Sequence, residues 1–162
     1  MKSYISAKQV KAYKAYRVTY PDGKVVFHVP GTNIPVGSKI EEGYRVIYPD
    51  GYKSWCPKEQ FKKSYMQLFS DEDEISEEML ANFFRGMTVS RSDEGRTVYV
   101  KVVLRNGDVM TESYTFSTID QYDEETGVGH CMERIYDKLR GHLEFMLHCA
   151  VRGVDLGGGD DE

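Results

Sequence analysis

The sequence predicts an α+β fold of two small domains, each an antiparallel β-hairpin sheet packed by helices. Three observations support this prediction. An eight-residue segment ending in Pro-Asp-Gly occurs twice in the first half of the chain, with one difference, Thr19 against Ile47. The dipeptide Asn106-Gly107 separates two β-rich runs in the second half. After these runs, apolar residues recur every three or four positions from Val128 to Ala150, as they do along one face of a helix.

The repeat begins at Tyr16 and returns 28 positions later at Tyr44. In its Pro-Asp-Gly end, proline presets φ, aspartate caps the turn and glycine takes the positive φ. Each copy therefore predicts a hairpin, and the two hairpins together predict a four-stranded sheet. The expected strand pairs are Tyr16–Tyr20 with Lys24–Val29 and Tyr44–Tyr48 with Tyr52–Trp55, with Pro30–Gly43 as a connecting loop.

A short helix is predicted to begin at Pro57, because proline suits the first position of a helix. Its apolar face is formed by Phe61, Tyr65 and Leu68. We expect this helix to pack on the sheet beside Trp55.

The hairpin of the second domain is predicted over Arg96–Phe116. Asn and Gly both tolerate the positive φ of a two-residue type I′ turn, and a two-residue loop fixes the register of the strands. The predicted cross-strand pairs are Arg105 with Asp108, Leu104 with Val109, Lys101 with Glu112, and Tyr99 with Tyr114. The face expected to be buried carries Val98, Val100, Val102 and Leu104.

One long helix over Asp123–Ala150 is expected to cover that face. Glycines at its start predict that regular helix begins only near Gly129, and Gly153 is expected to end it. A shorter helix is predicted over Glu77–Arg85, which gives the order helix, hairpin, helix. The apolar stripe of the long helix is Val128, Met132, Ile135, Leu139, Leu143, Met146 and Ala150.

Charge is divided unevenly along the chain. Residues 1–69 hold 12 Lys and Arg against 5 Asp and Glu, a net charge of +7; residues 70–162 hold 9 against 21, a net charge of −12, and the whole chain carries −5. We therefore predict a basic domain over residues 1–69 and an acidic domain over 76–153. An acidic linker over 70–75 joins them, and a disordered acidic tail over 154–162 follows.

The composition also predicts the setting. No apolar run reaches the length of about 18 residues that a membrane span needs, and the N-terminal segment lacks the apolar core of a signal peptide. Three cysteines without motif spacing predict reduced thiols in a cytosolic compartment.

Two stretches resemble proteins of tailed bacteriophages. The run from Tyr48 to Phe61, Tyr-Pro-Asp-Gly-Tyr-Lys-Ser-Trp-Cys-Pro-Lys-Glu-Gln-Phe, resembles a short module found in many small phage proteins. The segment from about Ile75 to Val151 resembles a family of small phage accessory proteins of unknown function, through Val103–Gly107, Tyr122–Gly127 and the helix as far as Leu147. The resemblance implies a phage protein acting in the cytoplasm of a bacterial host. It carries no known catalytic residues.

The first functional hypothesis uses the acidic half. A dense acidic face can occupy the nucleic-acid groove of another protein, because such grooves carry strong positive potential. With the phage context, this predicts a non-enzymatic accessory protein that binds and inhibits a host protein, such as a defence nuclease complex of the CRISPR kind. An ordinary solvated face is the alternative. The residues assigned to this face are Asp71, Glu72, Asp73, Glu74, Asp120, Asp123, Glu124 and Glu125.

The second hypothesis uses the basic half, where aromatic and cationic residues alternate. Such a surface would suit single-stranded nucleic acid or a small nucleotide signal. The alternative is a tyrosine-rich core with solvated lysines. The residues assigned to this surface are Tyr16, Arg17, Tyr44, Arg45, Tyr48, Tyr52, Lys53 and Trp55.

Other chemistry has weak support in the sequence. His130-Cys131 and His148-Cys149 are adjacent pairs, which point about 100° apart on a helix and rarely share a metal ion. We predict no metal, no cofactor and no catalysis. Cys56 is the one nucleophile candidate, because a helix N-terminus lowers a thiol pKa, but no base partner is evident. The exposed second face of the hairpin would permit a dimer.

Overall fold

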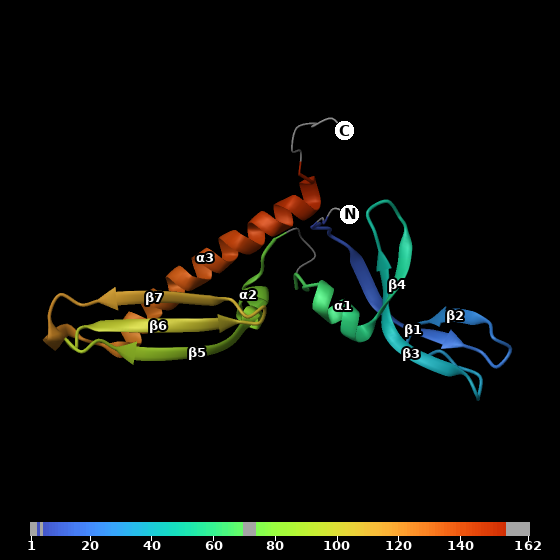
Figure 1. Cartoon of the computed structure of the whole chain (residues 1–162), viewed down its shortest axis with the longest axis horizontal. Coiled ribbons are helices and arrows are strands. Elements are labelled where there is room, and N and C mark those ends of the chain that lie inside the picture. Colours follow the sequence, from blue (N-terminus) through green and yellow to red (C-terminus); the bar gives the residue numbers. More distant parts are fainter. Residues whose placement is uncertain (1–2, 4, 70–73, 155–162) are drawn as a thin grey trace. The chain divides into compact units, whose positions relative to one another are not determined.

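The computed structural model describes residues 3, 5–69 and 74–154. The chain divides into two compact units, one comprising residues 1–67 with 150–162 and the other comprising Leu68–Cys149. Each unit holds its own antiparallel sheet, so the predicted α+β fold is confirmed (Figure 1). Residues 70–73 and the tail from residue 155 lie outside the described residues, and so do the expectations placed on them.

The first unit contains a four-stranded sheet with the order β2-β1-β3-β4. The bounds are β1 Lys11–Thr19, β2 Val25–His28, β3 Lys39–Ile47 and β4 Lys53–Pro57. The central strands β1 and β3 pair along their whole length, from Lys11 opposite Ile47 to Thr19 opposite Lys39. The prediction that the connecting loop reaches Gly43 is therefore wrong, because Lys39–Gly43 is needed to pair with the second half of β1.

Both Pro-Asp-Gly segments form the predicted turns. The amide of Gly23 donates to the carbonyl of Tyr20 (2.9 Å), and the amide of Gly51 donates in the same way to Tyr48 (2.9 Å). In each turn the aspartate carboxylate accepts from the amide two residues on, and glycine takes a φ of 86° or 84°. The repeat in sequence is thus a repeat in structure.

Helix α1 (Lys58–Ser64) follows β4 directly. Its Phe61 stacks on Tyr44 with ring centroids 4.0 Å apart, and Tyr65 stacks on Phe61 at 4.6 Å. Two details differ from the prediction. Pro57 is the residue before the helix rather than its first residue, and Leu68 packs against the core of the second unit.

The second unit contains a three-stranded sheet with the order β5-β6-β7. Strand β5 was not predicted, and the order helix, hairpin, helix is therefore incomplete. A bulge at Phe84–Gly86 shifts the register of β5, so that Phe84, Met87 and Val89 share one face without strict alternation. The elements are α2 Glu77–Phe83, β5 Phe84–Arg91, β6 Thr97–Leu104, β7 Val109–Thr115, the short 3₁₀ helix η1 Ile119–Gln121 and α3 Glu124–Arg152.

The predicted register of the β6–β7 hairpin is wrong by one residue. The amide of Gly107 donates to the carbonyl of Leu104 (3.0 Å), and that of Leu104 donates to Asp108 (2.8 Å), which closes a three-residue loop. Asn106 accepts from the amide of Asp108, as the aspartates do in the Pro-Asp-Gly turns. The observed pairs are Lys101 with Thr111, Tyr99 with Ser113 and Val100 with Glu112.

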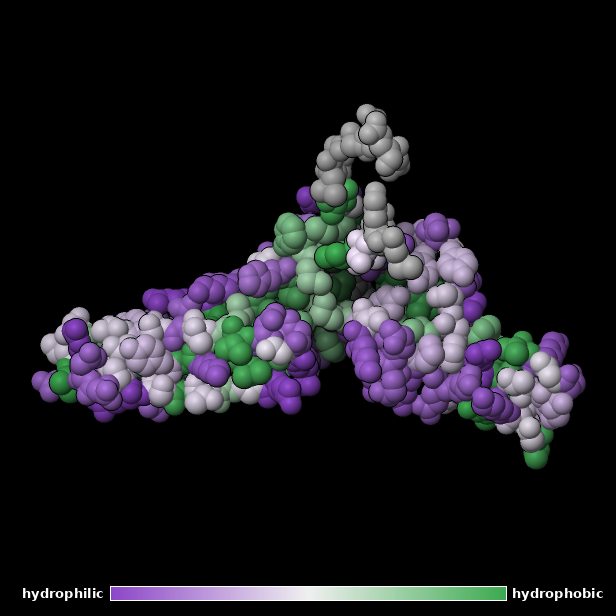
Figure 2. Space-filling view, viewed as in Figure 1, coloured by the Kyte–Doolittle hydropathy of each residue, from purple (hydrophilic) through white to green (hydrophobic). Residues whose placement is uncertain are grey.

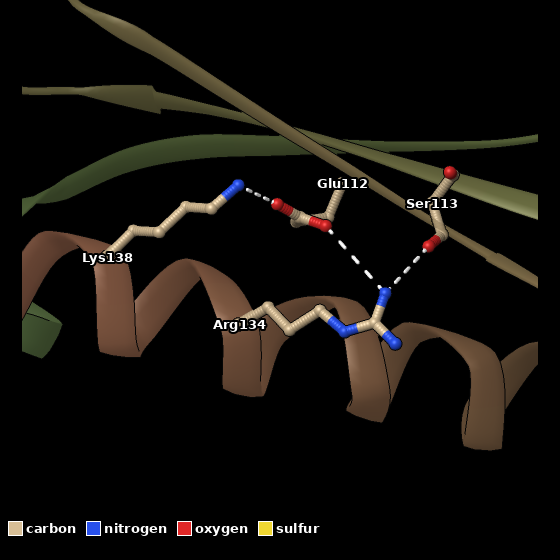
Figure 3. Close-up of polar contacts among 4 residues, drawn as sticks. All are labelled: Glu112, Ser113, Arg134 and Lys138. Atoms are coloured by element: carbon tan, nitrogen blue, oxygen red, sulfur yellow. Dashed lines mark hydrogen bonds and ion pairs between the residues drawn. The ribbon is translucent and has the colours of Figure 1, made fainter.

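This shift turns Glu112 toward helix α3. Its side chain is only 12% exposed, and its carboxylate accepts from Lys138, while Arg134 lies 3.9 Å from the second carboxylate oxygen (Figure 3). Arg134 also donates to the backbone carbonyl of Ser113 at 3.2 Å. Two cations from consecutive turns of α3 thus neutralise the one acid that faces the helix from β7.

The core of the second unit lies between the sheet and α3. The predicted buried face of β6 is confirmed, since its four residues are at most 3% exposed. On α3 the buried residues recur every fourth position: Gly127, Cys131, Ile135, Leu139, Leu143 and Leu147. Three members of the predicted stripe belong to this row, whereas Met146 is 46% exposed and Val128, Met132 and Ala150 are half-buried.

Helix α3 begins at Glu124, five residues earlier than predicted, and ends at Arg152 before Gly153 as expected. Gly127 does not weaken its first turn but allows close packing. A Cβ atom there would lie 2.4 Å from Cγ1 of Val98. Hydrophobic residues gather toward the C-terminal part of α3 in Figure 2, where Phe145 and Met146 are exposed.

Candidate ligand-binding surface

The sheet of the first unit separates the predicted aromatic and basic residues onto two faces. Residues paired across neighbouring strands share a face, and successive residues alternate. Tyr16 and Tyr44 therefore lie on the side of α1, where Tyr44 meets Phe61. Tyr48 lies on the same side, because its hydroxyl is 3.4 Å from that of Tyr65.

Three of the tyrosines on the α1 side contact other aromatic residues. The ring of Tyr52 lies 5.7 Å from that of Tyr48. The hydrogen bond between Tyr48 and Tyr65 raises the pKa of Tyr65 to about 12 and lowers the pKa of Tyr48. Four of the eight predicted residues, Tyr16, Tyr44, Tyr48 and Tyr52, thus belong to the α1 side of the sheet, where Tyr52 remains 64% exposed.

The other four lie on the opposite face, together with residues that the sequence analysis missed. Arg17 is opposite Phe27 of β2, Arg45 is opposite Trp55 of β4, and Lys53 is opposite Ile47 of β3. Phe27 is 41% exposed. Extending the repeat beyond its glycines would have found Phe27, because it lies 28 residues before Trp55.

The sheet bends toward this face. In a flat sheet the outer strands β2 and β4 would be about 14 Å apart, at about 4.8 Å per strand. The rings of Phe27 and Trp55 nevertheless have centroids only 6.4 Å apart. They meet above the small pair Ala15 and Gly43, where a Cβ on Gly43 would lie 2.8 Å from the Trp55 ring. Figure 1 shows the curvature of β1 and β3. We call this side of the sheet the concave face.

Two arginines pack on these rings. The guanidinium of Arg17 lies 5.6 Å from the Trp55 ring centre, and that of Arg45 lies 4.5 Å from the Phe27 ring centre. Such contacts hold the planar guanidinium groups in place and leave their N–H groups able to bind anions. The concave face therefore presents two oriented cations beside two aromatic rings.

The concave face has approximate two-fold symmetry. Ala15 pairs with Gly43, and these two residues, 28 positions apart, directly precede the two copies of the repeat. The symmetry axis therefore passes between them. It relates Arg17 to Arg45 and Phe27 to Trp55, and each arginine packs on the aromatic ring of the other copy.

Two lysines extend this symmetry, and one acid breaks it. Lys11 and Lys39 are also 28 positions apart, are related by the same axis and occupy the same face. Glu41 lies 3.2 Å from Lys39 and 3.5 Å from Arg17, so it bridges both cations. The equivalent position beside Arg45 holds Tyr13, which carries no charge at neutral pH.

Cys56 lacks the environment of a nucleophile. It lies in β4 rather than at the first turn of a helix, and burial raises the pKa of its thiol. The expected depression of that pKa is therefore wrong. In the described part of the chain, no three His, Cys, Asp or Glu side chains are close enough to hold a metal ion. None of its helices is long and apolar enough to cross a membrane.

The predicted acidic face is only partly described. Asp71, Glu72 and Asp73 lie outside the described residues, and Glu74 lies just before α2. The remaining four residues lie near the start of α3: Asp120, Asp123, Glu124 and Glu125.

Local contacts explain part of this cluster. Asp123 precedes α3 and accepts from the Glu125 amide (3.1 Å) and the Thr126 hydroxyl (2.8 Å). The Thr126 hydrogen bonds lower the pKa of Asp123. Arg91 lies 3.8 Å from the ring centre of Tyr122, whose hydroxyl donates to Glu124 (3.3 Å), so a cation borders the cluster.

The excess of acid is also smaller in the described region. Residues 74–154 hold 14 Asp and Glu against 9 Lys and Arg, a net charge of −5. Seven of the 21 acids of residues 70–162, and none of the 9 cations, lie outside the described residues, which accounts for the rest of the −12. In contrast, the cations of the concave face all lie on described strands.

Comparisons with protein-family models, with curated proteins and with solved structures find no match to this chain.

Proposed function

We propose that this protein acts by binding, without catalysis, and that the concave face of its first unit binds a nucleotide-containing ligand, either single-stranded nucleic acid or a small nucleotide. The observation that carries the proposal is the packing of Arg17 and Arg45 on Trp55 and Phe27. Consistent with the phage resemblance, the setting would be the cytoplasm of an infected bacterium.

The chemistry of the concave face matches such ligands. Guanidinium groups bind phosphate through paired N–H donors, and cations along a groove follow a phosphate backbone. Bases stack on aromatic rings and on guanidinium planes. Among the described residues of β1–β4, this face carries Lys11, Arg17, Lys39, Arg45 and Lys53 against the single acid Glu41.

Binding of a labelled single-stranded oligonucleotide of about 15 nucleotides tests the proposal, since the small OB-fold domains that bind single strands cover about 4–16 nucleotides each. Fluorescence anisotropy measures the dissociation constant. We expect Arg17→Gln/Arg45→Gln to weaken binding about 100-fold, because each lost charged hydrogen bond costs about 1.5 kcal/mol, or about tenfold. Affinity should also fall as salt rises.

The matched control is Lys14→Gln/Lys62→Gln. It removes the same charge from the first unit, but Lys14 lies on the α1 side of β1 and Lys62 lies on α1 itself. Retained binding in this control excludes a general effect of charge. Equal loss in both double variants, or no binding by the parent protein to oligonucleotides or small nucleotides, would contradict the proposal.

A second candidate function is favoured by Asp120, Glu124 and Glu125, which are exposed near the start of α3 and form no ion pair with the described residues. These three acids would form the acidic face of an inhibitor. Its partner would be a host protein with a basic nucleic-acid groove, such as a defence nuclease complex.

A pull-down from nuclease-treated host lysate tests this second function. Asp120→Asn/Glu124→Gln/Glu125→Gln should reduce recovery of the captured protein at least about tenfold, because these substitutions remove the negative charges that would face the positive groove of the partner. The matched control is Glu133→Gln/Asp137→Asn/Glu144→Gln, which neutralises three exposed acids elsewhere on α3. Equal recovery with both triple variants would exclude the acidic face at α3 as the contact.

A further inference from the structure

The two-fold symmetry of the concave face points to a more specific ligand. Resting on the proposed function, we propose that this face binds a cyclic dinucleotide, with the two phosphates of the ligand held by two equivalent half-sites. The Arg17 half-site comprises Arg17, Lys39 and Glu41. The Arg45 half-site comprises Arg45, Lys11 and Tyr13.

Symmetry carries this inference. The axis between Ala15 and Gly43 places one guanidinium and one aromatic ring on each side. A cyclic dinucleotide with two identical bases has the same symmetry, because its two nucleosides are joined by two equivalent phosphodiesters. It can therefore make the same contacts twice. A single strand runs in one direction and meets the two half-sites differently.

Charge supports the same ligand. A cyclic dinucleotide carries two negative charges, one on each phosphate. Each half-site offers an arginine that is held against a ring and a lysine from the neighbouring strand: Arg17 with Lys39, and Arg45 with Lys11. The two phosphates therefore match two pairs of cations, while the bases can stack on Phe27 and Trp55 or on the guanidinium planes.

Glu41 marks the phosphate position in the Arg17 half-site. Its side chain is 37% exposed, and its carboxylate already bridges Arg17 and Lys39, as a ligand phosphate would. A bound phosphate must displace this carboxylate. The Arg45 half-site has Tyr13 at the equivalent position and needs no such displacement, so Glu41 weakens one half-site relative to the other.

Isothermal titration calorimetry with cyclic di-GMP and cyclic di-AMP tests the proposal, with the linear dinucleotide pGpG as the open-ring control. We expect one ligand per chain and binding of at least one cyclic probe that is about tenfold tighter than that of pGpG. Arg17→Gln and Arg45→Gln should each weaken binding by a similar factor, about tenfold, since each removes one charged contact.

Glu41→Gln should tighten cyclic dinucleotide binding about threefold, the scale of one exposed ion pair. The control is Glu42→Gln, which makes the same charge change one residue along β3. Glu42 lies on the α1 side, where it accepts from Lys58 at 2.6 Å, and its replacement should leave binding unchanged. Far-ultraviolet circular dichroism checks that each variant is folded.

The outcomes separate this inference from the proposed function. Oligonucleotide binding without cyclic dinucleotide binding would overturn the inference and leave the function standing. Equal affinity for cyclic and linear probes, or two ligands per chain, would also overturn it. If Glu41→Gln and Glu42→Gln bound the cyclic dinucleotide with equal affinity, Glu41 would not occupy the phosphate position. Failure of every nucleotide probe, with the parent and with Glu41→Gln, would overturn both proposals.

Discussion

At the residue scale, two glycines of α3 have opposite roles. Gly127 is buried against Val98 and Phe116, where a Cβ atom would meet side-chain atoms at 2.4 and 3.2 Å. Gly129 is exposed, and nothing lies within 4 Å of the position that its Cβ would take. The sequence alone treats both as weak points of the helix. Packing against the sheet distinguishes them: close contact with Val98 requires glycine at position 127, whereas Gly129 only lowers the stability of the helix.

This difference predicts opposite effects of alanine. Gly129→Ala should raise the free energy of unfolding by about 1 kcal/mol, the helix propensity gained. Gly127→Ala gains the same propensity but overpacks the contact with Val98, which costs about 1–3 kcal/mol, so stability should fall or stay unchanged. Urea unfolding followed by circular dichroism measures both. Equal stabilisation by both variants would show that the contact at Gly127 relaxes freely.

Only some of the residues of the concave face could be identified from the sequence. Arg17, Arg45, Lys53 and Trp55 were identifiable by composition, but the four tyrosines assigned with them belong to the other side of the sheet. Composition along a strand mixes the two faces, and only the pairing register separates them. The register also brings in Phe27 and Glu41, which lie outside the eight-residue segment that repeats most visibly.

At the element scale, turn chemistry was predictable but loop length was not. The dipeptide Asn-Gly occurs in both two-residue and three-residue hairpin loops. A two-residue loop at Asn106-Gly107 would pair opposite charges across the strands, such as Lys101 with Glu112. The structure instead uses the three-residue loop of the Pro-Asp-Gly turns, with positive φ at Gly107 alone. Glu112 then faces the helix, which is tolerable only because Arg134 and Lys138 reach it. Cations on a separate element thus support the observed register.

Strand β5 was missed for a different reason. Its bulge at Phe84–Gly86 breaks the alternation by which strands are recognised. The long helix, by contrast, was predictable in type and in where it ends, because its buried row repeats every fourth position from Gly127 to Leu147 and Gly153 follows it; its start was predicted five residues too late. The regular spacing of buried helix residues can be read from the sequence, whereas the bulge in β5 can be located only when its pairing with β6 is known.

At the scale of the whole molecule, the two units differ in their cores. The buried apolar residues among the described part of β1–β4 are Ala15, Val18 and Val46, whereas the second unit buries a cluster of twelve residues. Since stability rises with apolar area buried, the first unit should unfold more easily. The split into a basic and an acidic half was predictable by counting charges, but counting could not assign a function to either half.

One tryptophan makes this difference measurable. Trp55, the single tryptophan of the chain, lies in the first unit, and α3 supplies most of the helix. Urea unfolding should give a lower midpoint by tryptophan fluorescence than by the helical circular dichroism signal, because the two probes report different cores. Gly129→Ala should raise the second midpoint and leave the first unchanged. Coincident midpoints that shift together would indicate one cooperative unit.

The contact between Arg134 and Ser113 has a consequence for solubility. Strand β7 is an edge of its sheet, and Ser113 directs its backbone carbonyl away from β6, since the neighbouring even-numbered residues make the ladder bonds. Such free carbonyls are templates on which a strand of another molecule can add, which is how aggregates grow. By donating to this carbonyl, Arg134 occupies an acceptor that an incoming strand would need. The long helix thus protects the sheet edge from self-association as well as covering its core.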